Sequence, residues 1–459
     1  MTRHFDLCVI GTGSGNSVVD ERFADQSVAI VEKGVFGGTC LNRGCIPSKM
    51  LIVPADLVQE ARHSARLGVD LRVDAVRWGD LTGRVFGRID PIAEKGRQYR
   101  EGLSNVTVFQ SEAGFTGPMT LRVGEEEITA SQFVIATGAE PVVPEIAGLD
   151  SVAYDTSDTL MRRSEVPSRM VVVGGGFIAA EMSHAFSSFG SAVTVVVRGE
   201  RMLTGEDDEV SARFTAEFGQ QVDLRLRSTV SSVRPGSDGC IVATVTGDGG
   251  TREIETDCLL VAVGRRPTSG PLHLDRTGVD VDGTGHVVTD EFLRTTAEGI
   301  WALGDVRSPL QLKHLANRDA RVVAHNLLHP DALHSIDDRA VPHAVFANPQ
   351  IGSVGLTEQE CLRQGIDVAV GARDYGGVAY GWALEDSTSF AKVLVDRRTG
   401  RIVGAHVMGP QAATLVQIPT QAMALGNTAE EVARSVVYPH PALSEVIENA
   451  LLDAVGKLA

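Results

Sequence analysis

The chain has 459 residues, and its 42 Lys and Arg against 59 Asp and Glu give a net charge of −17. This acidity argues against a nucleic-acid partner, because phosphate contacts need a basic face. Hydrophobic residues make up 43% and charged residues 22%, which is typical of a globular protein. No apolar run has the length of a signal core or a membrane span. We therefore expect a cytoplasmic protein with no membrane contact.

Two segments read as strand–turn–helix–strand units. The first has the apolar strand FDLCVI from Phe5, the glycine turn GTGSGN, a short helix in SVVDERFA, and the strand SVAIVEK. The second begins near Arg169 with the strand RMVVV, continues into a helix opened by GGGFIAAE, and returns as the strand AVTVVVR. Two such units predict two Rossmann-like nucleotide-binding domains in an α/β chain.

Proline-rich or polar segments at 139–150, 264–271 and 329–342 predict linkers. After the third linker, strand-like runs (HAVFA, AKVLV, RIVGAHVMG) mix with two helical stretches (ATLVQIPTQAMALG, ALSEVIENALLDAV). This pattern predicts an α+β domain at the C-terminus.

The first glycine fingerprint is Gly11-x-Gly13-x-x-Asn16. Its glycines let the backbone approach a pyrophosphate, and Glu32, at the end of the next strand, is placed to accept hydrogen bonds from a ribose. Asn16 stands where Gly or Ala is usual, so the match is imperfect. The alternative is an ordinary strand–turn–helix without a ligand.

The second fingerprint, Gly174-x-Gly176-x-x-Ala179, fits fully. The residue at the end of the following strand is Arg198, with Arg201 close by, where an acid would repel a 2′-phosphate. These arginines favour NADPH over NADH. The alternative is that both are solvated surface residues.

The segment GGTCLNRGCIPSK carries Cys40 and Cys45 directly after the first unit. Pro47 suits the first turn of a helix, and a helix N-terminus at Cys45 would stabilise its thiolate. Two close thiols indicate a redox pair or half of a metal site, and no CxxC partner occurs, so we expect no metal. The other cysteines, Cys8, Cys240, Cys258 and Cys361, are expected to be inert packing residues.

Two further positions are weaker when taken alone. His440 lies between two prolines and five residues before Glu445, so the two could form an oriented acid–base pair. Asp305 in GIWALGDV would by itself be an unremarkable turn residue.

Together these motifs resemble the flavoprotein disulfide reductases, the class I pyridine nucleotide-disulfide oxidoreductases, over essentially the whole chain. The resemblance implies FAD and NADPH as cofactors, a homodimer with shared active sites, and a low-molecular-weight disulfide as substrate. It implies four regions: an FAD domain in 1–148, an NAD(P)H domain in 149–264, a segment completing the FAD domain in 265–335, and an interface domain in 336–459.

The resemblance also implies residue roles. Cys40 would attack the substrate disulfide, Cys45 would face the flavin, and His440, oriented by Glu445, would be the acid–base of the partner subunit's site. Lys49 and Glu181 would pair beside the flavin, with Phe177 as a gate over it. The remaining implied cofactor-binding residues are Gly11, Gly13, Gly15, Glu32, Thr39, Ala113, Gly138 and Asp305 for FAD, and Gly174, Gly176, Ala179, Arg198, Arg201 and Gly264 for NADPH.

Within the family, the strings GTGSGNSVVDERF, FGRIDPIA and YGGVAYGWALEDS are similar to the mycothione reductases, which implies the disulfide of mycothiol as substrate. At position 204 this sequence has Thr, whereas the glutathione reductases tend to have a second phosphate-binding Arg at that position. A dihydrolipoamide dehydrogenase would usually have an acid where Val197 stands. A non-catalytic flavin-binding scaffold is a further alternative, against which the intact Cys40, Cys45 and His440 argue.

The segment YGGVAYGWALEDS (375–387) is a candidate wall of the substrate pocket. Tyr380 and Trp382 offer flat faces, and Glu385 and Asp386 offer acceptors. The alternative is a buried β-hairpin with two core aromatics.

Overall fold

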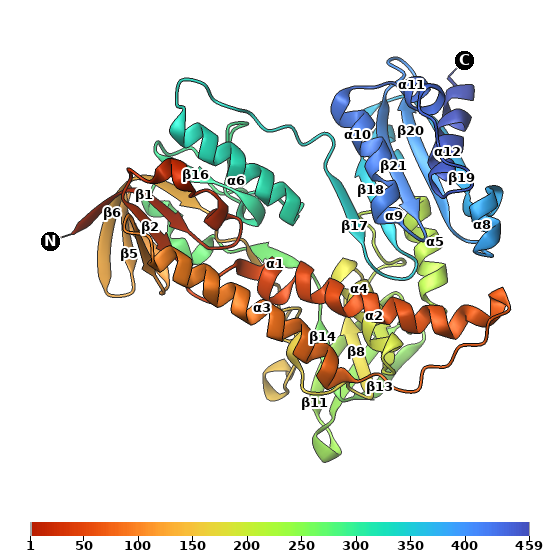
Figure 1. Ribbon diagram of the computed structural model, residues 1–459. Coiled ribbons are helices and arrows are strands. Elements are labelled where there is room, and N and C mark those ends of the chain that lie inside the picture. Colours follow the sequence, from red (N-terminus) through yellow and green to blue (C-terminus); the bar gives the residue numbers. More distant parts are fainter. Residues whose placement is uncertain (1, 459) are drawn as a thin grey trace.

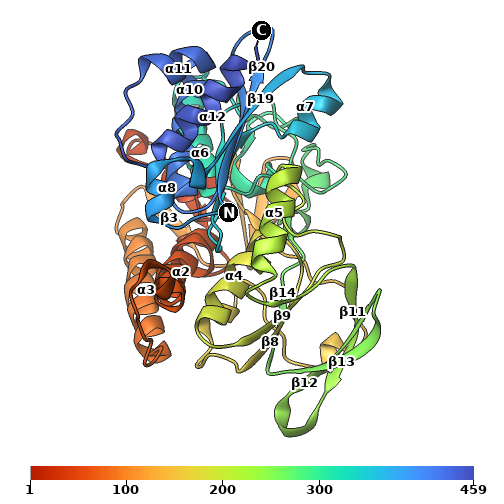
Figure 2. The same ribbon diagram turned by 90° about the vertical axis from the view of Figure 1, so that its right-hand side faces the viewer.

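Five β-sheets with their helices make up the computed structural model, which describes residues 2–458 (Figure 1). The first seven-stranded sheet and helix α6 (Lys313–Leu328) lie on the side of the N-terminus. The second strand–turn–helix–strand unit lies below them, and the C-terminal segment forms a separate block. Figure 2 shows the second and C-terminal units stacked one above the other.

The first sheet is built on β1 (Arg3–Ile10), which is parallel to β2 on one side and β6 on the other. Its order is β3-β2-β1-β6-β5-β4, and β16 pairs with β6. Side chains from both faces of β1 are buried, Leu7 and Val9 in one apolar cluster and Cys8 and Ile10 in another. Burial on both faces is typical of a parallel strand covered on each side. The other strands are β2 (Val28–Val31), β3 (Val106–Phe109), β4 (Ala113–Gly117), β5 (Thr120–Val123), β6 (Glu126–Ile135) and β16 (Ile300–Ala302).

The predicted α-helix in SVVDERFA is wrong. The crossover from β1 to β2 contains only two 3₁₀ turns, Gly15–Ser17 and Glu21–Phe23. Carbonyl groups of the crossover that a helix would have satisfied internally accept hydrogen bonds from Arg100 of α3 (Trp78–Glu101) instead. Its guanidinium donates to Asn16 Oδ1 at 2.8 Å, to Asn16 O at 2.6 Å and to Val19 O at 2.7 Å. These contacts also explain why an Asn stands at position 16, since its side chain accepts the hydrogen bond that joins the crossover to α3.

Two helices carry the cysteine segment. Helix α1 (Gly38–Arg43) contains Cys40, and α2 (Cys45–His63) begins at Cys45, with Gly44 between them in a non-helical conformation. Pro47 lies in the first turn of α2, as predicted. A 3₁₀ turn (Ser64–Leu67) follows α2, and α2 packs against both α3 and the first helix of the second unit.

The second unit has the predicted parallel strands and its predicted helix. Its four-stranded sheet has the order β10-β9-β8-β14, and a three-stranded antiparallel sheet, β11-β12-β13, lies beside it. Helix α4 follows β8, as the second fingerprint predicts. The elements are β8 (Arg169–Val173), α4 (Phe177–Ser188), β9 (Ala192–Val196), α5 (Asp208–Phe218), β10 (Asp223–Arg225), β11 (Ser228–Pro235), β12 (Ile241–Gly247), β13 (Gly250–Thr256) and β14 (Cys258–Val261).

The chain enters and leaves the second unit at one place. Strands β7 (Ala139–Pro141) and β15 (Arg265–Pro267) form a two-stranded antiparallel sheet. They come from the two segments predicted as linkers at 139–150 and 264–271. The second unit is therefore an insertion whose two connections are paired with each other.

The C-terminal unit is an antiparallel sheet of order β17-β18-β21-β20-β19 with helices packed on it. Val446, Ile447, Ala450, Leu451 and Ala454 give α12 a buried apolar face. The elements are β17 (Pro342–Val345), β18 (Ile351–Gly355), α7 (Glu358–Gln364), β19 (Val368–Asp374), α8 (Ala379–Ala383), β20 (Phe390–Asp396), β21 (Ile402–Met408), α9 (Ala412–Leu415), α10 (Gln417–Leu425), α11 (Ala429–Ser435) and α12 (Ser444–Gly456).

The alternative of a buried hairpin at 375–387 is wrong. Tyr380 and Trp382 lie on the short helix α8, and Trp382 is 64% exposed. Its indole Nε1 donates to the backbone oxygen of Gly376 at 2.7 Å. The two aromatic side chains are therefore held at the surface.

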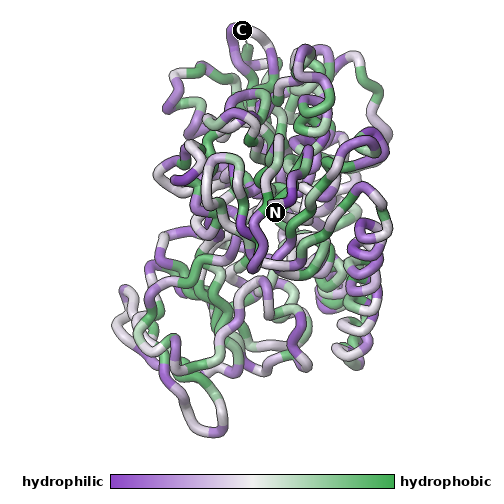
Figure 3. Tube along the Cα trace, turned by 90° about the vertical axis from the view of Figure 1, so that its left-hand side faces the viewer, coloured by the Kyte–Doolittle hydropathy of each residue, from purple (hydrophilic) through white to green (hydrophobic). Residues whose placement is uncertain are grey.

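The distribution of hydrophobic residues follows the sheets. The buried hydrophobic residues include most side chains of the central strands, and Figure 3 shows hydrophobic stretches in the middle of the molecule and hydrophilic ones in many of the loops at its margin. No helix within residues 2–458 is both long enough and apolar enough to cross a bilayer. The four isolated cysteines, Cys8, Cys240, Cys258 and Cys361, are buried, as expected of packing residues.

Candidate functional site

A cavity of about 1970 Å³ lies where the first, second and C-terminal units meet. Most of the site residues predicted from the sequence line it. They are Gly11, Gly13, Glu32, Thr39, Cys40, Cys45, Lys49, Ala113, Gly138, Gly174, Gly176, Phe177, Glu181, Arg198, Arg201, Gly264 and Asp305.

The first glycine of each fingerprint is required by the backbone around it. Gly11 has φ +103° and Gly174 has φ +133°, a region that favours glycine. A Cβ atom would lie 2.3 Å from Ala136 O at Gly11 and 2.2 Å from Ala262 O at Gly174. Close packing against a neighbouring backbone therefore requires glycine at both turns, and both glycines line the cavity.

Glu32 is fixed at the end of β2 by three donors. Its Oε2 accepts from the Thr12 backbone N–H at 2.9 Å and from the Thr12 hydroxyl at 2.6 Å, and its Oε1 accepts from the Gly34 N–H at 2.8 Å. The Thr12 hydroxyl in turn accepts from the Gly37 N–H at 3.0 Å. The carboxylate is thus pre-oriented at the edge of the cavity, where it can accept hydrogen bonds from a ligand's hydroxyl groups.

Asp305 is another carboxylate that lines the cavity, and it lies in a 3₁₀ turn (Gly304–Val306) after β16. Burial raises its pKa, and the cations Arg265, Lys313 and His286 oppose this increase. Within residues 2–458 no hydrogen bond to the Asp305 carboxyl group contributes to its pKa. A partly buried carboxylate facing a cavity without a donor fits a ligand that brings hydroxyl groups.

Cys40 and Cys45 are both free thiols in the structure. Hydrogen bonding with the Cys40 side chain, together with the Lys49 ammonium, lowers the pKa of Cys45 to about 7. The same hydrogen bond raises the pKa of Cys40, and burial raises it further. The pair is therefore asymmetric, with the thiolate favoured on Cys45.

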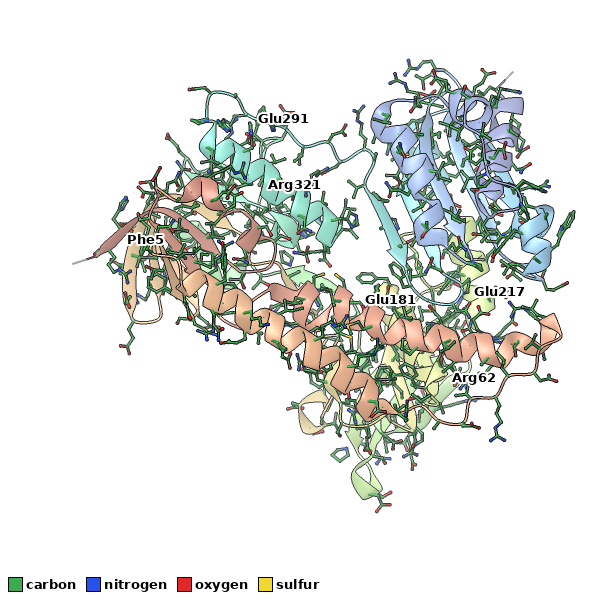
Figure 4. All side chains as sticks on the ribbon, in the orientation of Figure 1. Phe5, Arg62, Glu181, Glu217, Glu291 and Arg321 are labelled. Carbon is green, nitrogen blue, oxygen red and sulfur yellow. The ribbon has the colours of Figure 1, made fainter. Side chains whose placement is uncertain are left out.

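Lys49 and Glu181 form an ion pair between α2 and α4, at distances of 2.8 and 2.7 Å from Lys49 Nζ to the two carboxylate oxygens. Figure 4 shows Glu181 at the centre of the molecule, between α2 and the C-terminal block. Phe346, which follows β17, donates its backbone N–H to Glu181 Oε1 at 3.0 Å, and its ring lies 4.5 Å from Lys49 Nζ. Three units of the fold therefore meet at this charge pair.

The second unit places Phe177 at the start of α4, where the ring lines the cavity and is 47% exposed. The two arginines that follow β9 differ in their surroundings. Arg201 donates to Asp208 Oδ1 at 3.0 Å and to Asp208 O at 2.9 Å. Arg198 is exposed and forms no ion pair with any acid in the described part of the chain. Arg198 is therefore the arginine with free donors.

Four predicted residues do not line the cavity. Gly15 and Ala179 are buried, and a Cβ at Gly15 would lie 2.6 Å from that of Ala136, so both act through packing. His440 and Glu445 lie on the C-terminal unit, where His440 Nδ1 donates to Glu445 Oε1 at 2.8 Å. This bond, and one from the Ala442 N–H, lower the pKa of Glu445. The structure thus forms the His–Glu pair but keeps it away from the cysteines of the same chain.

Among the cavity residues that were not predicted from the sequence are Arg265, Lys313 and Phe346. Arg265 donates to Ala139 O at 2.6 Å and so ties β15 to β7. Lys313 and Phe346 reach the cavity from elements far along the chain. No local motif marks either of them, because their contacts come from the packing of distant segments.

Comparisons with known proteins agree with this geometry. Residues 5–320 match the family model described as pyridine nucleotide-disulphide oxidoreductase, and residues 341–451 match the dimerisation domain of the same family. The chain therefore belongs to the pyridine nucleotide-disulphide oxidoreductases. It is a disulfide oxidoreductase that uses FAD and a pyridine nucleotide and carries a homodimerisation domain, which confirms the predicted fold class and family.

Individual relatives narrow the comparison. The chain is 48% identical to the mycothione reductase of Mycobacterium tuberculosis, covering 98% of this chain and 99% of that one. It is 34% identical to the dihydrolipoyl dehydrogenase of Halobacterium salinarum, covering 98% and 96%. Among solved structures, the HOCl-induced flavoprotein disulfide reductase RclA from Escherichia coli superimposes with a TM-score of 0.84 at 28% identity, covering 97% and 99% of the two chains.

The charge of Lys49 should control the acidity of Cys45. Replacing Lys49 by Met removes a nearby cation and leaves the Glu181 carboxylate, so the pKa of Cys45 should rise above about 7. We expect an increase of about one unit, which corresponds to about 1.4 kcal/mol of attraction between the Lys49 ammonium and the Cys45 thiolate. The measurement is the pH dependence of iodoacetamide alkylation at Cys45, followed by peptide mass spectrometry. Lys95→Met, on the exposed face of α3, is the control, and an unchanged Cys45 profile in Lys49→Met would contradict the assignment.

Proposed function

We propose that this protein reduces the disulfide of mycothiol with NADPH, in the cytoplasm, through a Cys40–Cys45 redox pair. The observation that carries the proposal is the placement of two asymmetric thiols in one cavity with two dinucleotide fingerprints. The 48% identity to a mycothione reductase over nearly the full length of both chains supports the substrate. A redox pair that works as free thiols also suits a reducing compartment.

The domain boundaries are part of this proposal. Residues 1–148 and 265–335 would form the FAD domain, 149–264 the NADPH domain and 336–459 the interface domain. The pairing of β7 with β15 supports an inserted second unit, and the pairing of β16 with β6 supports a first unit completed late in the chain.

The first unit offers what FAD requires. Gly11 and Gly13 bring the main chain to the cavity, while the carboxylates of Glu32 and Asp305 can accept hydrogen bonds from ribose and ribityl hydroxyls. Thr39, Ala113 and Gly138 would line the rest of the site. FAD, when bound, would supply the transfer of two electrons from the nicotinamide to the cysteine pair. Lys49, held by Glu181, would place a fixed positive charge beside it.

Thiol–disulfide exchange would then proceed from the reduced pair. The sulfur of Cys40 attacks one sulfur of the substrate, the substrate's S–S bond breaks, and one thiol leaves with a proton. Cys45 then attacks the Cys40 sulfur, which releases the second thiol and re-forms the Cys40–Cys45 disulfide. Two electrons from NADPH restore the reduced pair, so one disulfide is converted to two thiols in each cycle.

The proton for the departing thiolate would come from His440 of the partner subunit. Within one chain His440 is 70% exposed, and its Nδ1 is engaged by Glu445, which leaves Nε2 free. A neighbouring carboxylate that accepts from Nδ1 fixes the tautomer and orientation of an imidazole. Glu445 would therefore orient His440 toward the other subunit's cavity.

Arg198 should determine the preference for NADPH. A hydrogen bond to a charged group contributes about 1.5–3 kcal/mol, or roughly ten- to a hundredfold in affinity. Arg198→Glu should therefore raise KM for NADPH by that factor and change KM for NADH little. Arg201→Gln is the matched comparison, and its effect should be smaller because Asp208 already binds Arg201. Equal losses with both nucleotides in Arg198→Glu would mean that Arg198 has no role in reading the phosphate.

A site shared between subunits should be recoverable by mixing. Homodimers of Cys40→Ser and of His440→Ala should both be inactive. A heterodimer of the two variants has one site with all its residues, so it should show about half of the wild-type activity. Differently tagged chains, co-expressed and purified through both tags, provide the sample. Inactive mixed dimers would place His440 in the site of its own chain or outside catalysis.

The substrate itself is tested by a panel of purified disulfides. With NADPH as donor, mycothione should exceed glutathione disulfide and lipoamide in kcat/KM by about tenfold or more, which corresponds to about 1.4 kcal/mol in transition-state binding. Steady-state oxidation of NADPH at 340 nm measures all three. A preference of that size for lipoamide or glutathione disulfide would overturn the substrate assignment and leave the disulfide reductase assignment intact.

A further inference from the structure

Lys313 is a cavity residue to which the exchange chemistry above assigns no task. It is the first residue of α6, is half-buried and lines the same cavity as Cys40 and Cys45. Its ammonium donates to the Ser14 hydroxyl at 2.8 Å, and that hydroxyl donates to Asn317 Oδ1 at 3.0 Å. In the part of the chain that the structure describes, no carboxylate lies within 4 Å of the ammonium.

The position is unfavourable for a lysine. The N-terminus of a helix carries partial positive charge, so a cation there is repelled rather than stabilised. The first turn of α6 contains no acidic residue, and its N-cap makes no side-chain hydrogen bond that could compensate. A half-buried ammonium held only by a hydroxyl keeps two N–H donors that can interact with a negative charge in the cavity.

The loop that anchors Lys313 lies against the helix that carries Cys40. Ser14 follows Gly13, and a Cβ on Gly38 would lie only 2.6 Å from the Cα of Gly13. Gly38 begins α1, two residues before Cys40. The Ser14 loop, which holds the ammonium, thus contacts the start of the helix that carries Cys40, and Ser14, Lys313 and Cys40 all line the same cavity.

Each of the two cysteines is influenced by a different lysine. The hydrogen bond to Cys45 and burial raise the pKa of Cys40, and Lys313 is the cation that lowers it. For Cys45, Lys49 is the cation that lowers the pKa, while Asp305 raises it. The groups that face the pair are thus Lys49 from α2, Lys313 from α6 and Asp305 from the turn after β16.

We propose that Lys313 is a positioning residue of the disulfide exchange, whose ammonium stabilises the thiolate of Cys40 in the reduced enzyme. The inference rests on the proposed role of Cys40 as the attacking thiol. The thiolate, not the thiol, is the nucleophile, and in the reduced pair the proton is otherwise held on Cys40 in its hydrogen bond to Cys45. Lys313 offsets this bias, so that Cys40 can lose its proton and attack the substrate sulfur.

The test measures Cys40 directly in the holoenzyme. The NADPH-reduced enzyme is treated with iodoacetamide between pH 6 and pH 11, a range that extends above the ordinary pKa of a thiol, and the alkylation rate at Cys40 is quantified by peptide mass spectrometry. In Lys313→Met the profile should move to higher pH by about one unit, so the rate below the midpoint should fall roughly tenfold and converge with the wild-type rate at high pH. Lys313→Arg keeps the charge and should retain most of the wild-type profile.

Controls separate charge from structure. Lys95→Met removes an equivalent charge outside the cavity and should leave the profile unchanged. Ser14→Ala removes the hydroxyl that holds the ammonium and should give a smaller shift in the same direction, which keeps the inference testable should Lys313→Met fail to fold. A Lys313→Met profile that is slower at every pH but unshifted would overturn the inference, as would loss of bound FAD from that variant. A substrate panel that rejects mycothione would leave the profile unaffected, so the two failures are distinguishable.

Discussion

Close contact between two stretches of backbone determines where the chemistry of this protein takes place. The loop after β1 lies against the start of α1, with Gly13 and Gly38 so near that a Cβ on Gly38 would be 2.6 Å from the Gly13 Cα. This contact brings the glycine turn that would bind FAD beside the helix that carries Cys40. Glu32 and Thr12 stabilise the same corner through hydrogen bonds among their own segments. The helix that carries Cys40, one of the two thiols of the proposed redox pair, is therefore positioned by the glycine loop itself.

The electrostatics of the cavity contrast with the acidic character of the chain. A net charge of −17 would disfavour thiolates, yet Lys49 and Lys313 each lie near one cysteine. Lys49 is bound by Glu181, which fixes its position and reduces its net charge effect, whereas Lys313 is bound only by a hydroxyl. The two cations thus differ in strength as well as in location, and this difference is consistent with separate tasks for the two thiols.

The sequence predicted those parts of the structure that depend on local patterns. Both glycine turns, the cysteine segment and the α+β character of the C-terminal unit follow from residue spacing alone. The crossover after β1 could not be predicted, because Arg100, which satisfies its carbonyls, lies on a helix about eighty residues away. Lys313 was missed for the same reason, since only tertiary packing places α6 against the Ser14 loop. The surface position of Trp382 could not be predicted from the spacing of hydrophobic residues either. Its helix has only five residues, which are too few to show which face is buried.

The role proposed for His440 gives the dimerisation domain a task in catalysis as well as in assembly. The His440–Glu445 pair is fully formed in one chain, with its geometry set by the turn before α12, but it lines no part of that chain's cavity. Close to the pair in sequence, the neighbouring apolar side chains of Val436 and Val437 are 49% and 95% exposed, which is compatible with a surface that a second chain covers. An acid–base pair that is built before assembly needs no rearrangement on docking. Dimerisation would then complete two sites at once, because each subunit offers a finished pair to the other's thiols.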